Sequence, residues 1–181
     1  MKKFVALLLA LLLALPMVAL GEAVPSPSAD AVEVPEVKIG QVLYAAHGEK
    51  CFAVITVAVI GDTIVAAHIE EFQYMDASTA VGVPNSDKSF GTAFPEGKVL
   101  ASKRENNDLY SANMANAGST VALVDNYTII EDFVVGMTIA ELEAVLAGKT
   151  AEEMVDAVSG ATLVDTLGYL QGILAAAKAA K

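Results

Sequence analysis

Residues 51–72, CFAVITVAVIGDTIVAAHIEEF, decide the fold of this chain. The stretch from 51 to 60 is rich in β-branched side chains, and a second apolar run begins at Thr63. Between the two runs lies Gly61-Asp62, a pair typical of a tight hairpin turn. The sequence therefore predicts two antiparallel strands, over 51–60 and 63–72. Because the first strand is apolar on both faces, we expect it to be covered on both sides.

A further strand is predicted before the hairpin, over residues 37–45, with a turn at Gly48-Glu49. After the hairpin the apolar pattern weakens, and residues 75–116 are expected to be irregular. This segment is punctuated by turn-forming residues, namely Pro84, Asn85, Gly91, Pro95 and Gly97. A long irregular segment inside a compact domain is more often functional than idle.

The last third of the chain is predicted to be helical. Residues 127–135 have apolar side chains at helical spacing, and Gly136 is a typical helix stop. Two Thr-x-x-Glu capping boxes, Thr138 with Glu141 and Thr150 with Glu153, each predict the start of a further helix. A third helix is predicted at the C-terminus, where four leucines fall on one face: Leu163, Leu167, Leu170 and Leu174. A hairpin followed by helices indicates an α+β fold, a single domain in which a hairpin-based antiparallel sheet packs against C-terminal helices.

The first 21 residues are typical of a secretory signal peptide. Lys2 and Lys3 precede an apolar run over 4–20, and Ala19-Leu20-Gly21 provides small residues before a cleavage after Gly21. Retention of this segment as a membrane anchor is the alternative, because the run is close to the shortest length that spans a bilayer. We therefore expect an extracytoplasmic protein, either secreted or associated with the cell envelope.

Residues 22–36 are predicted to be a flexible linker, because prolines, serines and acidic residues fill them. This leaves residues 37–181 as the folded domain. Cleavage after Gly21 removes two lysines and changes the formal charge from −11 to −13. So acidic a protein is not expected to bind nucleic acid or anionic lipid, both of which require Lys and Arg.

Few other residues indicate chemistry. The chain has one cysteine, Cys51, which excludes an intrachain disulfide, and its position in an apolar strand predicts a buried, unreactive thiol. His47 and His68 lack further ligands at metal-binding spacing, so we expect no metal site.

The segment that carries most chemistry is residues 156–162, Asp-Ala-Val-Ser-Gly-Ala-Thr. It is expected to lie directly before a C-terminal helix that starts near Leu163. A hydroxyl residue beside a glycine at a helix start can hold a phosphate against the free backbone N–H groups. The alternative is an ordinary loop in which Thr162 only caps the helix.

This segment resembles the Asp-x-x-Ser/Thr-Gly-Ala-Thr motif of the FMN-binding domain family. These covalent threonyl-FMN flavoproteins include peripheral subunits of Rnf complexes and of the sodium-pumping NADH:quinone reductase. In the family, a flavin transferase uses FAD to attach FMN through a phosphoester bond to the last threonine of the motif. The resemblance implies that Thr162 carries FMN and that Asp156 assists the attachment, with Ser159, Gly160 and Ala161 in the middle positions.

The resemblance therefore implies an exported flavoprotein that transfers electrons outside the cytoplasmic membrane. Its expected partners are a flavin transferase and a membrane-bound or extracellular redox protein. An electron carrier is favoured over a stand-alone enzyme, and a role as a flavin-dependent reductase component stays open. Two alternatives also stay open: FMN bound without a covalent bond, and a cofactor-free secreted binding module of the same fold.

The segment before residue 116 supplies further candidates for flavin contacts. Lys103 and Arg104 are candidates for the phosphate, although a solvated loop is the simpler interpretation. Tyr110, Met114 and Phe90 are candidates for a flavin pocket, and core packing explains them equally well. The chain departs from the family at one place, because members often have Thr or Ser two positions after the acceptor, where this chain has valine.

Overall fold

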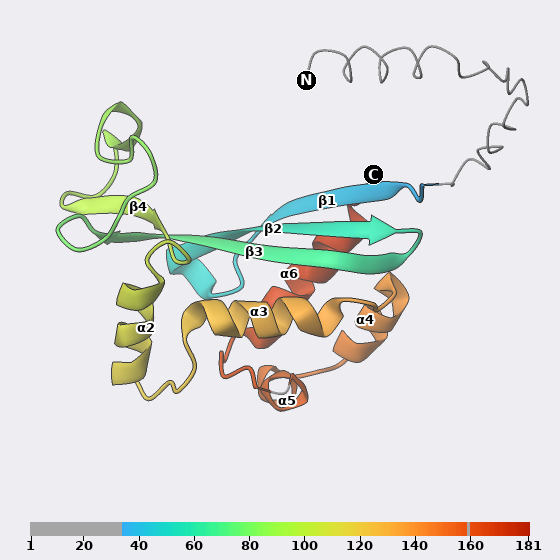
Figure 1. The fold of residues 1–181 in the computed structure, drawn as a ribbon. Helices are drawn as coiled ribbons and strands as arrows, with labels where there is room; N and C mark the ends of the chain where they lie inside the picture. The colour runs from blue at the N-terminus through green and yellow to red at the C-terminus, as the bar shows by residue number, and fades with distance from the viewer. Residues whose placement is uncertain (1–33, 159) are drawn as a thin grey trace, which may run out of the picture. The chain divides into compact units, whose positions relative to one another are not determined.

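A four-stranded antiparallel sheet forms one layer of the folded unit, Pro35–Lys181 (Figure 1). The structure is a computed structural model that describes residues 34–158 and 160–181. The expected signal peptide, most of the expected linker and Ser159 therefore lie outside the described residues. The strands follow one another in the sheet in chain order: β1 (Val37–Tyr44), β2 (Cys51–Ile60), β3 (Thr63–Asp76) and β4 (Lys98–Ser102).

The predicted hairpin and the strand before it are confirmed. Ile60 pairs with Thr63 across the turn, and Gly61 has φ +63°, a conformation that favours glycine. β1 is antiparallel to β2 along its whole length, from the pair Val37–Ile60 to the pair Tyr44–Ala53. β3 runs beyond the expected end at residue 72 and reaches Asp76.

Five helices are seen in the described residues: α2 (Asn107–Asn116), α3 (Leu123–Val134), α4 (Ile139–Leu146), α5 (Ala151–Ala157) and α6 (Thr166–Lys178). Short 3-10 turns occur at η1 (Gly48–Lys50) and η2 (Ser89–Gly91). Both predicted capping boxes are confirmed, because the threonine hydroxyl and the glutamate carboxylate bond each other's backbone N–H at α4 and α5.

The segment predicted to be irregular contains both β4 and α2, so that expectation is wrong. β4 has only five residues and is formed by pairing with the far end of β3, from Phe72–Ser102 to Asp76–Lys98. The sequence of α2 lacks a clear apolar stripe, and none of its residues is fully buried. Both elements depend on distant contacts more than on their own sequence pattern.

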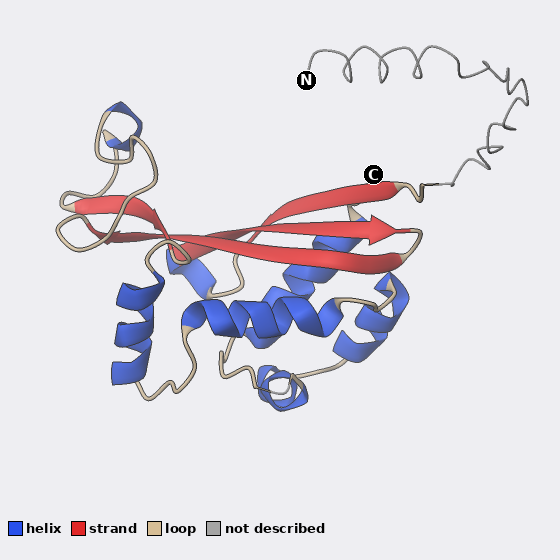
Figure 2. Cartoon of the chain, viewed as in Figure 1, coloured by secondary structure: helices blue, strands red, loops and turns tan. Residues whose placement is uncertain are grey.

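The main core lies between one face of the sheet and the helices α3, α4 and α6 (Figure 2). Alternate residues of β2 are fully buried there: Ala53, Ile55, Val57 and Val59. The expectation that β2 is covered on both sides is wrong, because the helices all lie on one side of the sheet. The opposite face leaves large apolar side chains exposed, and Leu43 is 72% exposed.

The last helix approaches the sheet closely through glycines. A Cβ built on Gly40 of β1 would lie 1.8 Å from the carbonyl oxygen of Ala176 in α6. A Cβ on Gly172 of α6 would lie 2.4 Å from Cδ1 of Ile55. The backbones of β1 and α6 therefore touch at Gly40, and Gly172 makes room for the side chain of Ile55.

We expect Gly40→Ala to lower the free energy of unfolding by about 1–3 kcal/mol, because the added methyl group forces α6 away from the sheet. Urea denaturation followed by circular dichroism measures this change. The control is Gln41→Ala, on the exposed face of the same strand, which should change the value by no more than about 0.5 kcal/mol. Equal stability of Gly40→Ala and the parent protein would contradict the close contact.

Candidate functional site

Thr162 lies on the irregular link between α5 and α6, and its side chain is exposed. The helix expected from Leu163 begins only at Thr166, with Asp165 at the N-cap. A turn precedes it, in which the N–H and hydroxyl of Thr166 both donate to the carbonyl of Leu163, at 3.1 and 2.6 Å. Thr162 is therefore neither the cap of α6 nor a group at its N-terminus, and both of those expectations are wrong.

The backbone of Thr162 is held by Asn126, a fully buried residue of α3. The Thr162 N–H donates to Asn126 Oδ1 at 2.7 Å, and the Thr162 hydroxyl donates to the same oxygen at 3.3 Å. Asn126 Nδ2 donates to the carbonyls of Val121 and Ala122, at 3.2 and 3.0 Å, which orients the side-chain amide. Sequence reasoning missed Asn126, whose signal is a polar residue on the buried face of a helix.

The neighbours of Thr162 in the motif form a sharp turn. Gly160 is exposed with φ +93°, and Ala161 is buried and donates its N–H to the carbonyl of Val158 at 3.0 Å. The glycine allows the chain to reverse between two buried residues, because its φ is unfavourable for other side chains. The result is that Ala161 anchors the segment while Thr162 faces outward.

Asp156 lies on α5, and its side chain is exposed. Together with Val164, two residues after Thr162, it lines a cavity of about 360 Å³ beside α5. The structure thus places Asp156 and Val164 around one cavity. The remaining motif residue, Ser159, is outside the described residues.

A second cavity, of about 380 Å³, begins directly after Thr162, and we call it the motif cavity. Three consecutive residues of the link line it: Leu163, Val164 and Asp165. Lys103, Tyr110, Met114 and Tyr169 are among its other walls. The structure therefore brings three of the candidates for flavin contact, Lys103, Tyr110 and Met114, to the link that directly follows the motif.

The other two candidates lie elsewhere. Phe90 lines a different cavity. Arg104 forms an ion pair with Glu131 at 2.5 Å and donates to the carbonyl of Ile69 at 2.6 Å. Arg104 therefore links β3 to α3 and is not part of the wall of the motif cavity.

Lys103 is 1% exposed, so the interpretation as a solvated loop is wrong for this residue. Its ammonium group lies 2.6 Å from Oε2 of Glu71, which is fully buried. The same oxygen accepts hydrogen bonds from the hydroxyls of Tyr127 at 2.6 Å and Tyr169 at 2.9 Å. The other carboxylate oxygen accepts from the Cys51 thiol at 3.3 Å.

The charges of this cluster stabilise each other. Burial disfavours both ions, but their attraction outweighs it, so the pKa of Glu71 falls below its usual value and the pKa of Lys103 rises above its own. Burial also raises the pKa of Tyr127 and Tyr169, so both stay protonated as donors. Burial and the charge of Glu71 raise the pKa of Cys51 to about 11, which leaves the thiol unreactive at neutral pH.

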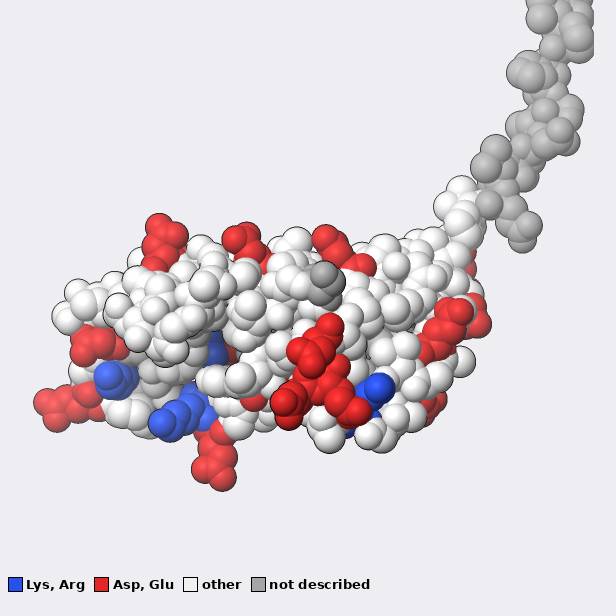
Figure 3. All heavy atoms as spheres, turned by 90° about the horizontal axis from the view of Figure 1, so that it is seen from below, with Lys and Arg blue, Asp and Glu red and all other residues white. Residues whose placement is uncertain are grey.

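Acidic side chains are spread over the helix side of the molecule, and basic ones are few (Figure 3). Among the residues that line the motif cavity, Lys103 is the single Lys or Arg, and Glu71 neutralises it. His47, at the same cavity, pairs with Asp165. The motif cavity is therefore not a strongly positive site.

Within residues 34–158 and 160–181, no group of three or more His, Cys, Asp or Glu side chains is arranged to hold a metal ion. His68 lies beside one carboxylate, with Nδ1 3.7 Å from Glu131. In the same residues, no helix has both the length and the apolar character needed to cross a bilayer.

We expect Glu71→Gln to lower the free energy of unfolding by about 3–5 kcal/mol at pH 7, because it leaves the ammonium group of Lys103 buried without a counter-charge. The matched control is Glu143→Gln, which breaks an exposed ion pair with Lys178 and should cost about 1 kcal/mol or less. Urea denaturation of each variant measures the difference. Equal costs for the two variants would contradict a buried ion pair.

The cost of Glu71→Gln should also depend on pH. The folded-state pKa of Glu71 is depressed, so its contribution is present above the ordinary glutamate value of about 4.3 and is lost as pH falls toward the lower folded value. The difference between parent and Glu71→Gln should therefore shrink between pH 7 and pH 3. The double variant Glu71→Gln/Lys103→Met should regain part of the lost stability, since it no longer buries a lone charge.

No family model, no curated protein and no solved structure matches the chain. A function for this chain is therefore inferred from the motif at residues 156–162 and from the geometry around Thr162.

Proposed function

We propose that this chain is an exported flavoprotein that carries FMN covalently on Thr162 and transfers electrons outside the cytoplasmic membrane. One observation carries the proposal: Thr162 is exposed, its backbone is held by Asn126, and the three residues after it line a cavity. A group tethered to Thr162 could therefore reach this cavity and be partly buried in it. Maturation would require a flavin transferase, and electron transfer a membrane-bound or extracellular redox partner.

The residues of the motif cavity fit a flavin. The volume of the motif cavity, about 380 Å³, is in the usual range for small-molecule sites, and its walls include Tyr110, Met114 and Tyr169. Aromatic and thioether side chains favour contact with a flat ring system. When bound, the flavin would supply the redox chemistry, and the chain would set its position, polarity and access to partners.

The hydroxyl of Thr162 is the group that would be modified. Attachment from FAD would form a bond between Thr162 Oγ1 and phosphorus, break the pyrophosphate bond of FAD, and release AMP. The hydroxyl proton must pass to a base, because a neutral threonine is a poor nucleophile. Asp156, which shares a cavity with Val164, is the candidate for this role within the chain.

The hydrogen bonds of Asn126 are compatible with the modified residue. Esterification would remove the hydroxyl donor, whereas the Thr162 N–H would still donate to Asn126 Oδ1. The backbone of the link would therefore keep its anchor.

The charge of the motif cavity favours a covalent tether over free binding. Lys103 is already paired with Glu71, and no second Lys or Arg lies among the described lining residues. A phosphate dianion held only by non-covalent contacts would normally need such cations. A phosphoester to Thr162 lowers the charge of the phosphate to one and holds it by a bond, so fewer cations are needed.

We expect Thr162→Ala to abolish flavin incorporation when the full chain is produced together with a flavin transferase. Intact mass should show the parent heavier by one FMN minus water, and a fluorescent band should survive a denaturing gel. Thr128→Ala, an exposed threonine of α3, is the matched control and should keep the flavin. Asp156→Asn should slow incorporation by roughly 100-fold or more if Asp156 acts as the base.

Two results would overturn the covalent proposal. Release of the flavin on denaturation would indicate that FMN is bound non-covalently. A secreted protein from the native host with the bare mass in every copy would indicate a cofactor-free module.

A further inference from the structure

A cavity with a greater volume than the two near Thr162 lies where the sheet changes width, and no residue of the motif lines it. The last β2–β3 pair is Cys51–Gln73, but β3 continues to Asp76 and pairs there only with β4. This step leaves one edge of β3 open beside η1. A cavity of about 610 Å³ lies at the step.

Five aromatic side chains line this cavity, which we call the aromatic cavity: Phe52, Phe72, Tyr74, Phe90 and Phe94. They include four of the six phenylalanines of the chain. Phe52 stacks on Phe72 with ring centroids 5.6 Å apart, and Phe94 makes edge-to-face contacts with Tyr74 at 4.9 Å and Phe90 at 5.4 Å. Phe90 is nevertheless 60% exposed, so much of this aromatic surface lacks a covering group.

The outer wall of the aromatic cavity comes from the segment between β3 and β4, which backbone contacts hold in place. The N–H of Val83 donates to the carbonyl of Leu100 at 2.7 Å, and the N–H of Phe94 donates to the carbonyl of Gly91 at 2.9 Å. Gly91 lies so close to Ser86 that a Cβ would stand 1.7 Å from its carbonyl oxygen. The aromatic wall is therefore formed before any ligand arrives, which lowers the entropic cost of binding.

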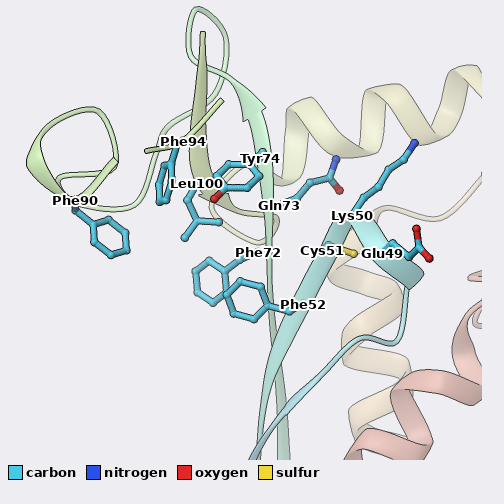
Figure 4. A pocket seen from close by; sticks show the side chains of 10 residues that line it. All are labelled: Glu49, Lys50, Cys51, Phe52, Phe72, Gln73, Tyr74, Phe90, Phe94 and Leu100. Carbon is cyan, nitrogen blue, oxygen red and sulfur yellow. The ribbon is translucent and has the colours of Figure 1, made fainter. Parts of the chain in front are cut away.

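The opposite end of the aromatic cavity is polar (Figure 4). The aromatic side chains lie on one side of the two strands, whereas Glu49, Lys50 and Gln73 lie on the other. Glu49 and Lys50 have opposite charges, so this end provides hydrogen-bonding groups without a strong net charge. The site is thus aromatic at one end and polar at the other.

We propose that the aromatic cavity binds a planar molecule of fused aromatic rings with a hydrogen-bonding group at one edge. Rings of this kind make stacked and edge-to-face contacts with the phenylalanines, which an alkyl chain does not. The volume is in the usual range for small-molecule sites. None of residues 156–165 lines this cavity, so the inference is independent of a flavin on Thr162.

The probe for the test is N-phenyl-1-naphthylamine, a fused-ring amine whose fluorescence rises in apolar surroundings. Thr162→Ala protein is the background, so that flavin emission does not interfere. The titration should saturate at one probe per chain. Phe90→Ala and Phe94→Ala should each weaken binding by about tenfold. Leu43→Ala is the matched control, an exposed apolar residue of the same sheet face outside the cavity, and should change the dissociation constant less than about twofold.

A second measurement places the probe. The chain has no tryptophan, so Phe90→Trp adds a single reporter at the mouth of the cavity. Its emission should be quenched as the probe binds. Phe90 is largely exposed, so the Phe90 variants should fold like the parent, and circular dichroism checks this.

Three results would overturn the proposal. Equal effects of Phe94→Ala and Leu43→Ala would mean that the probe binds the sheet face at large. A titration that does not saturate would also mean that the probe binds the sheet face without a defined site. A concentration-dependent dimer in analytical ultracentrifugation that Phe90→Asp dissociates would mean that the aromatic cavity is covered by a second copy of the chain.

Discussion

The buried ion pair between Glu71 and Lys103 is the interaction on which the rest of the structure depends. Glu71 belongs to β3 and Lys103 follows β4, while the two tyrosines that bond the carboxylate come from α3 and α6. One carboxylate thus joins the sheet to both of the helices that define the candidate site. A buried charge without its partners is strongly unfavourable, so these four elements must assemble together.

This cluster also forms part of the proposed flavin site. Lys103 and Tyr169 line the motif cavity, and Gln73 lines both the motif cavity and the aromatic cavity. Cys51 lines the aromatic cavity and lies 3.7 Å from the ammonium group of Lys103. The two cavities are therefore neighbours that share Gln73 in their walls.

The position of Thr162 depends on a different helix from the one its sequence suggests. The motif precedes α6, but it is Asn126 of α3 that holds the Thr162 backbone. The buried Ala161 fixes the segment on one side, and the exposed threonine faces outward on the other. This geometry supports a role for Thr162 as an attachment point, since it combines a fixed backbone with an exposed residue.

The sequence by itself determined the hairpin and both capping boxes, because each depends on a turn or cap contained within a few residues. The first strand and the end of α3 near Gly136 were also predicted, although β1 pairs with β2 and the N–H of Gly136 donates to Ile64 of β3. Tertiary structure alone decided the rest. β4 exists because β3 extends to meet it, Lys103 is buried because Glu71 lies opposite, and α6 starts late because a turn precedes Thr166. The uncovered face of β2 has the same origin, since only the packing of α3, α4 and α6 decides which side of an apolar strand is buried.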